Sequence, residues 1–225
     1  MTPITSTQVQ ELRRRTGAGM MACKAVLSAT GGDIDRAVEV LRKQGIAKAE
    51  SRETRPVGEG TIGSYVHHTS RIGAMVALAC ETDFVARTEA FRTLARQLAE
   101  QVAAAAPLAI EFGGVDPSVV AERRTAYEQQ VRASGKPEAL VAQIVAGKLA
   151  AFAKDVVLLE QAWIREPKKA IGELVAECSA RLGERIVVQR ITRFELGDPA
   201  SSRTAGTRKL PDLTERAGAD GKRPI

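Results

Sequence analysis

The residues best suited to chemistry lie in the stretch CETDFVAR, residues 80–87, where an apolar run ends. Asp83 is directly followed by Phe84, one of only five phenylalanines in the chain. A lone carboxylate makes a weak magnesium site, because Mg²⁺ requires octahedral oxygen ligands and usually a nucleotide's phosphates. The kinase signature DFG does not fit, since its glycine, the HRD loop and the glycine-rich loop are missing. The pair therefore either acts on the site of a partner or is structural, with Phe84 packing under the next helix.

Other candidate sites are weaker. TGAGMM, residues 16–21, contains glycines before a helix but lacks the GK[ST] ending of a phosphate loop, so it predicts a turn between helices. Met20 and Met21 are adjacent and cannot share one helix face, which leaves at least one exposed for an adaptable protein contact. His67 and His68 are neighbours on a predicted strand, where side chains alternate between faces, so we expect no joint metal site. We expect no catalytic constellation, no bound metal and no cofactor.

Composition favours a helix-rich protein that acts through binding. Aromatic residues are only 4% of the 225-residue chain, which argues against an aromatic-lined substrate pocket. The net charge of +6 leaves an acidic partner open. Three widely spaced cysteines among apolar neighbours predict buried thiols in a reducing compartment. The chain has no apolar run of about 18 residues, so we expect a cytoplasmic protein with no membrane contact.

The first fifty residues predict a three-helix bundle. Thr5 and Gln8 can form a capping box for the first helix, which the glycines of TGAG end. The second helix covers residues 20–29. Asp33 is placed to cap a third helix, which we expect Gly45 to terminate.

The middle of the chain predicts an antiparallel hairpin, GTIGSYVHH and RIGAMVALACE, joined by TS. A hairpin alone is marginally stable, and RIVVQRITRFEL, residues 185–196, is the best candidate for a third strand. The apolar residues at alternating positions, which we expect on one buried face of the hairpin, are Ile62, Val66, Ile72, Val76, Leu78 and Cys80.

Helices fill the interval between these strands. Thr88 is a predicted N-cap, and Asp116 followed by Pro117 is a strong helix start. SGKP then divides two helices, which we expect to form an antiparallel hairpin over about residues 116–159. A last helix follows IREP.

The fold class predicted is α+β, with a small three-stranded antiparallel sheet packed with helices and a helical hairpin. We expect a bundle over residues 1–47, a linker over 48–60, where periodicity gives way to charge, Pro and Gly, and a core over 61–197. Residues 198–225 show no pattern and are expected to be disordered.

These motifs resemble those of elongation factor Ts, the guanine-nucleotide exchange factor of elongation factor Tu. The N-terminal ELRRRTGAGMMACKAVLSATGGDIDRAVEVLRKQG looks like its ubiquitin-associated-like bundle, and IGSYVHHTSRIGAMVALACETDFVAR looks like its core hairpin with the TDFVA signature. SGKPEALVAQIVAGKLAAF, LLEQAWI and ITRFELG follow in family order, so the resemblance spans about residues 4–197. A single core makes the chain similar to the short type, which implies a possible homodimer.

The resemblance implies a mechanism and a set of contacts. It implies binding to elongation factor Tu in its GDP-bound and nucleotide-free forms, with exchange promoted and no covalent chemistry performed. Phe84 would act as a wedge that displaces the elements holding the partner's magnesium, and Asp83 would hydrogen-bond or repel near its phosphate-binding loop. The residues carried over as magnesium-displacing are Thr82, Asp83, Phe84 and Val85, and those carried over as partner-binding are Arg13, Met20, Met21 and either His67 or His68.

Two other functions compete with this one. The positive charge is compatible with a nucleic-acid-binding module of the translation apparatus, but no aromatic-and-basic stacking motif supports it, and we expect no direct nucleic-acid contact. The bundle could instead belong to a ubiquitin-type adaptor. Binding to RNA alone with steep salt dependence would favour the first, and retention on ubiquitin resin the second.

Overall fold

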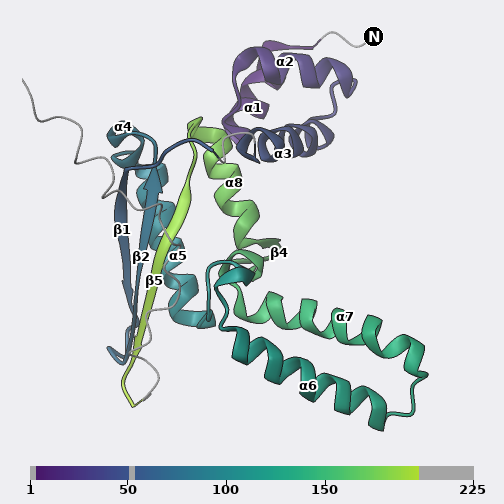
Figure 1. Cartoon of the computed structure of the whole chain (residues 1–225). Coiled ribbons are helices and arrows are strands. Elements are labelled where there is room, and N and C mark those ends of the chain that lie inside the picture. Colours follow the sequence, from purple (N-terminus) through teal and green to yellow (C-terminus); the bar gives the residue numbers. More distant parts are fainter. Residues whose placement is uncertain (1–3, 51–53, 198–225) are drawn as a thin grey trace, which may run out of the picture.

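The computed structural model describes residues 4–50 and 54–197. Its secondary structure confirms the α+β class (Figure 1). The predicted disordered tail, residues 198–225, lies outside the described residues. Within the described part of the chain, no helix is both long and apolar enough to cross a membrane.

The N-terminal bundle consists of α1 (Ser6–Thr16), α2 (Met20–Ala29) and α3 (Ile34–Glu50). The capping box of Thr5 and Gln8 is confirmed, and Gly17 ends α1 in the left-handed region at φ 69°. The Asp33 carboxylate accepts a hydrogen bond from the amide of Arg36 at 3.0 Å, as the helix start requires. The three helices enclose their own cluster of buried residues, which includes Leu12, Cys23, Leu27 and Ala37.

The prediction that Gly45 ends the third helix is wrong, because α3 continues to Glu50. Gly45 lies against α8 (Ile171–Leu182), where an added Cβ would come within 2.9 Å of the Ala180 methyl group. This glycine therefore allows close approach of two helices. Arg42 reinforces the contact through ion pairs with Glu173 at 2.7 Å and Glu177 at 3.3 Å.

The core sheet has the strand order β1-β2-β5, all antiparallel: β1 (Glu59–Val66), β2 (Ile72–Cys80) and β5 (Val187–Glu195). The third strand is thus the one predicted. Helix α5 (Glu89–Ala105) packs on one face of the sheet, with Phe91, Leu94 and Leu98 fully buried. The N-cap predicted at Thr88 is confirmed.

The prediction that Ile62 and Val66 face the core is wrong. They are 58% and 67% exposed, and Gly63 is the buried residue of β1. A Cβ on Gly63 would lie 2.2 Å from the carbonyl oxygen of Ala95, so α5 crosses β1 where no side chain intervenes. Because successive side chains alternate, the branched residues on either side point to the opposite face.

The remaining elements complete the core and one projecting arm (Figure 1). Helices α6 (Pro117–Ala133) and α7 (Glu138–Val156) form the predicted hairpin, which extends from the core on the same side as the bundle. A small hairpin of β3 (Ala162–Trp163) and β4 (Glu166–Ala170) was not predicted. The short helical elements are α4 (Asp83–Ala86), η1 (Phe112–Gly114) and η2 (Leu158–Glu160).

Candidate functional site

The TDFV segment, residues Thr82–Val85, begins where β2 ends. Thr82 has an extended backbone and is the N-cap of α4, its hydroxyl accepting a hydrogen bond from the amide of Val85 at 3.4 Å. Behind it, the buried thiol of Cys80 donates a hydrogen bond to the Thr82 carbonyl oxygen at 3.2 Å. A polar residue at the strand end thus starts a single helical turn and fixes its direction.

This turn separates anchored side chains from an exposed one. Val85 and Ala86 are buried in the main core cluster, whereas Phe84 is 78% exposed. The alternative that Phe84 packs under the following helix is therefore wrong. Phe91, seven positions later, is fully buried at the start of α5. Exposure of a large aromatic at a held position is the property expected of a contact residue.

The Asp83 carboxylate is paired on the surface of the same turn. It accepts from the Arg87 guanidinium at 2.9 Å, an i,i+4 pair with both partners exposed. Such a pair contributes little stability, so a partner can replace it at small cost. Arg87 was not predicted as part of the site, although its i,i+4 spacing from Asp83 was the available signal. Within the described residues, no three His, Cys, Asp or Glu side chains gather as a metal site.

The Cys80 thiol, which lies beneath the TDFV segment, has low nucleophilic reactivity. Burial, and then the negative charge of Glu184, raise the pKa of Cys80 to about 11. The thiol form, which can donate to Thr82, is therefore the form present at neutral pH. All three cysteines are buried free thiols, as predicted.

The two histidines lie in the turn after β1, where the strand has already ended at Val66. The prediction that they point to opposite faces is wrong, because their ring centroids are 4.0 Å apart. The amide of Ser70 donates to the His67 carbonyl oxygen at 2.8 Å, which closes the turn. His67 also contacts the Thr69 hydroxyl through Nδ1 at 2.9 Å.

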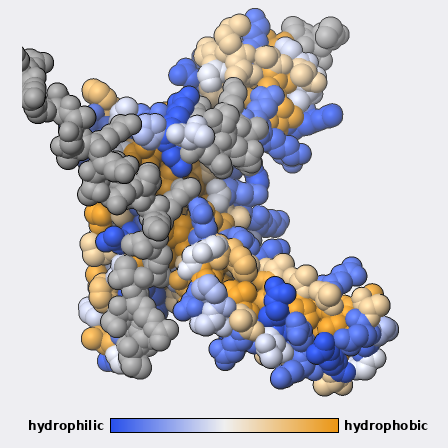
Figure 2. Space-filling view, in the orientation of Figure 1, coloured by the Kyte–Doolittle hydropathy of each residue, from blue (hydrophilic) through white to orange (hydrophobic). Residues whose placement is uncertain are grey.

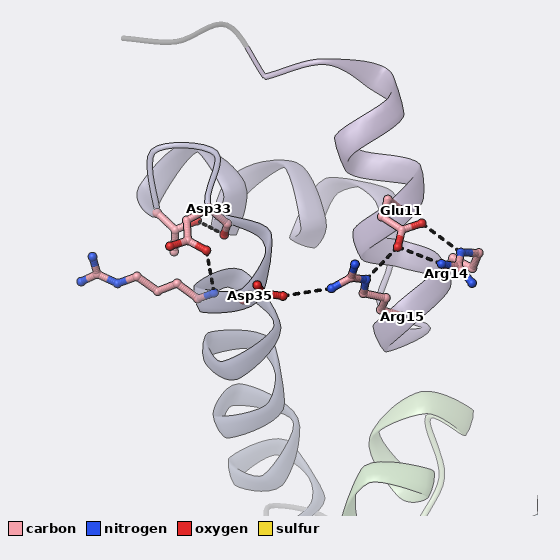
Figure 3. A network of polar contacts seen from close by, with 7 residues as sticks. Glu11, Arg14, Arg15, Asp33 and Asp35 are labelled. Carbon is pink, nitrogen blue, oxygen red and sulfur yellow. Dashed lines mark hydrogen bonds and ion pairs between the residues drawn. The ribbon is translucent and has the colours of Figure 1, made fainter.

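The bundle residues predicted to bind a partner are exposed. Met20 is 47% and Met21 77% exposed at the start of α2, and Arg13 is exposed on α1. Among the described residues, no ion pair engages Arg13, whereas Arg14 and Arg15 both pair with the Glu11 carboxylate (Figure 3). Hydrogen bonds from Arg14 and then Arg15 lower the pKa of Glu11 to about 2.

The predicted residues thus occupy three places. The TDFV segment follows Cys80, which pairs with Glu59, and the histidine turn lies at the other end of the β1–β2 hairpin. Seven residue steps from Cys80 to Gly73 place these ends about 24 Å apart. The bundle residues form the third place, above α8 (Figure 1). These three places are typical of a broad docking surface and not of one pocket.

Comparison with known proteins identifies the family. The family model described as elongation factor TS matches residues 25–198. The chain belongs to the elongation factor Ts family. The elongation factor Ts of Oleidesulfovibrio alaskensis is 47% identical over 197 residues, which cover 88% of this chain and 100% of the relative. That of Desulfitobacterium hafniense is 43% identical over 203 residues, covering 90% of this chain and 94% of the relative.

Membership explains the arrangement of the motifs along the chain. A third elongation factor Ts, from Thermosipho melanesiensis, is 44% identical over 195 residues and covered over its full length. The chain therefore belongs with the translation elongation factors, as the resemblance implied. The TDFV segment directly follows the core hairpin, and its Phe84 is the most exposed large apolar side chain among the described residues.

Proposed function

We propose that the protein binds elongation factor Tu in its GDP-bound form and promotes release of GDP, allowing GTP to bind. It does so by displacing the partner's magnesium ion and distorting the phosphate site, and it then holds the nucleotide-free form. The factor itself makes and breaks no covalent bond and carries no cofactor. It acts in the cytoplasm, where its family serves protein synthesis.

The observation that carries this proposal is the exposure of Phe84 between anchored neighbours. Its side chain is 78% exposed, while Val85 and Thr82 fix the turn on either side of it. An aromatic held in this way can insert between partner side chains and separate the elements that hold the metal. The Asp83 side chain is also accessible to a partner. On binding, its carboxylate would leave the ion pair with Arg87 and interact with polar groups of the partner's phosphate-binding loop.

The energy required is within reach of such a contact. A thousandfold faster GDP release corresponds to a barrier lower by about 4 kcal/mol. Loss of magnesium coordination and of hydrogen bonds to phosphate can supply this amount, and the docking surface supplies the binding energy that drives the distortion. By linkage, GDP must weaken the binding of the factor by the same ratio by which the factor weakens GDP.

We expect the other partner contacts to come from the bundle and from the histidine turn. Arg13, Met20 and Met21 would bind the GTPase domain from the bundle, since Met side chains adapt to irregular surfaces. One of His67 and His68 would bind the partner from the far end of the hairpin. The separate buried clusters of the bundle and the core support treating residues 1–47 and 61–197 as two domains. Of the predicted linker 48–60, residues 48–50 lie in α3 and residues 59–60 in β1.

We also propose that the protein forms a homodimer through the outer face of the sheet. This face carries exposed apolar side chains from all three strands, and no described helix packs on it; these residues are Ile62, Val66, Met75 and Phe194. Figure 2 shows apolar surface along the β1 side of the sheet. An apolar sheet face of this kind is suited to burial against a second copy.

The main proposal is tested with fluorescent GDP bound to elongation factor Tu. Phe84→Ala should slow factor-stimulated release by at least about tenfold, while the thermal unfolding of the factor changes little because the side chain is exposed. Phe112→Ala is a matched control, since this residue is also an exposed phenylalanine but lies on η1. Equal release rates for wild type and Phe84→Ala would refute the wedge. A wild-type factor without effect on release would refute exchange activity.

A further inference from the structure

Two glutamates at the end of the sheet hold the TDFV segment from behind. The Glu184 carboxylate accepts hydrogen bonds from the amide of Glu81 at 3.1 Å, the amide of Thr82 at 3.0 Å and the Thr82 hydroxyl at 2.5 Å. Glu184 precedes β5 and lies 102 residues after Thr82 in the sequence. Three donors from two consecutive residues thus converge on one side chain.

The contact is reciprocal. The Glu81 carboxylate accepts from the amide of Arg185 at 2.6 Å and from the Arg55 guanidinium at 3.3 Å. The Arg185 guanidinium in turn donates to the carbonyl oxygen of Arg55. Each of the two segments therefore supplies a carboxylate to the backbone of the other, and residue 55 is fastened to both.

These bonds begin where the sheet stops. The register of β2 with β5 ends at Ala79 and Val187, so the amides of Glu81 and Thr82 lie beyond the ladder. Charge-assisted bonds to a carboxylate are about twice as strong as bonds between neutral groups. The Glu184 carboxylate thus supplies the hydrogen-bond acceptor that a paired strand would otherwise offer to the amides of Glu81 and Thr82.

Thr82 transmits this restraint to the site. Its hydroxyl donates to Glu184 and accepts from the amide of Val85, so one oxygen connects the carboxylate to the first turn of α4. Without Glu184, the hydroxyl loses its acceptor and the two preceding amides lose theirs. The direction in which Phe84 leaves the core would then be less well defined.

We propose that Glu184 is a positioning residue for exchange, which fixes Thr82 and through it the orientation of Phe84 toward the partner. This inference rests on the proposed function and adds to it a residue outside the TDFV motif. In this proposal Glu184 acts through Thr82 and does not itself contact the partner. Its removal should therefore change how fast the bound partner releases GDP more than how tightly the factor binds.

The kinetic test compares Glu184→Ala with wild type over a range of factor concentrations. We expect the maximal rate of GDP release to fall at least about fivefold while the half-saturating concentration changes less than about threefold. Glu184→Gln retains one carbonyl acceptor and should lie between the two. Glu100→Ala is the control, since Glu100 is also a carboxylate of the core but is bound to Arg165 and not to the TDFV segment. A smaller fall in maximal rate, or an equal effect of the control, overturns the proposal.

A second readout needs no partner. Hydrogen–deuterium exchange of the free factor should show faster exchange at the amides of Glu81 and Thr82 in Glu184→Ala, with the amide of Val76 in mid-strand unchanged. Unchanged exchange at both amides overturns the proposal. If Glu184→Ala fails to fold, Glu184→Gln decides through the same two measurements: its maximal rate should fall, and the amides of Glu81 and Thr82 should exchange faster than in wild type.

The two proposals fail separately. If wild type does not accelerate GDP release, the proposed function fails, whatever the amides do. If Phe84→Ala slows release and the Glu184 variants do not, the wedge stands and only the positioning role is lost.

Discussion

Replacement of Gly63 by alanine tests how closely α5 approaches the sheet. The added Cβ would lie 2.2 Å from the carbonyl oxygen and 2.4 Å from the carbonyl carbon of Ala95. Comfortable carbon contacts are about 3.5–4.0 Å, so the helix and the strand must separate by roughly 1 Å. The obstacle is helix backbone and not the end of a flexible side chain, so local rearrangement cannot relieve it.

The cost follows from what this separation disturbs. Leu94, Ala95 and Leu98 are buried at this contact, and all would lose packing against the strands. Overpacking of a core costs about 1–3 kcal/mol, and the upper end applies because backbone meets backbone. We therefore expect Gly63→Ala to lower the free energy of unfolding by about 3 kcal/mol. For a chain of this size that lowers Tm by roughly 6–12 °C.

Thermal and urea unfolding followed by circular dichroism measure this change. Gly147→Ala is the matched control: Gly147 is exposed within α7, and a Cβ there would meet nothing within 4 Å. It should raise stability by up to about 1 kcal/mol through helix propensity. A loss of less than about 1 kcal/mol in Gly63→Ala would show that α5 does not lie on β1 as described.

The remaining predictions concern charge and association. Because the pKa of Glu11 is lowered from 4.5 to about 2, its contribution to stability is present above pH 4.5 and is lost as the pH falls toward 2. Glu11→Gln should therefore lose less stability than wild type between about pH 5 and pH 3, and parallel losses in urea midpoint would contradict this. Light scattering should give twice the 24.1 kDa chain mass for wild type and one chain mass for Ile62→Glu, with Leu140→Glu, an exposed apolar residue on α7, as control. A single-chain mass for wild type would exclude the sheet-face dimer at that concentration.

Features set by neighbouring residues could be predicted from the sequence. The capping box at Thr5, the cap at Thr88 and the helix start at Asp116 depend on contacts within four positions, and all three are confirmed. The TDFV segment was found because an acid and an aromatic end an apolar run. Its exposure was not predictable, since the same pattern fits a buried Phe84.

Features set by distant partners could not be predicted. Gly45 has the sequence context of a helix end, but α3 continues through it, and a Cβ at this position would lie 2.9 Å from the Ala180 methyl group of α8. Ile62 and Val66 have the alternation of a core face, but the crossing of α5 at Gly63 reverses it. The β3–β4 hairpin has no apolar period. It is attached to α5 by the buried side chain of Gln101, which donates to the Ala162 carbonyl oxygen at 3.2 Å and accepts from the amide of Ile164 at 3.0 Å.

Rigid anchoring of an exposed aromatic would have an energetic consequence for the proposed exchange activity. Ordering the backbone of one residue costs about 1–2 kcal/mol, so a flexible four-residue TDFV segment would consume roughly 4–8 kcal/mol on binding. That is as much as the roughly 4 kcal/mol needed for a thousandfold effect on GDP release. The free energy of ordering this segment is already spent when the factor folds, because the segment is held by Thr82, Val85 and Glu184. In the proposed function, burial of Phe84 in the partner, about 1.5–3 kcal/mol, would then remain available to distort the partner's site.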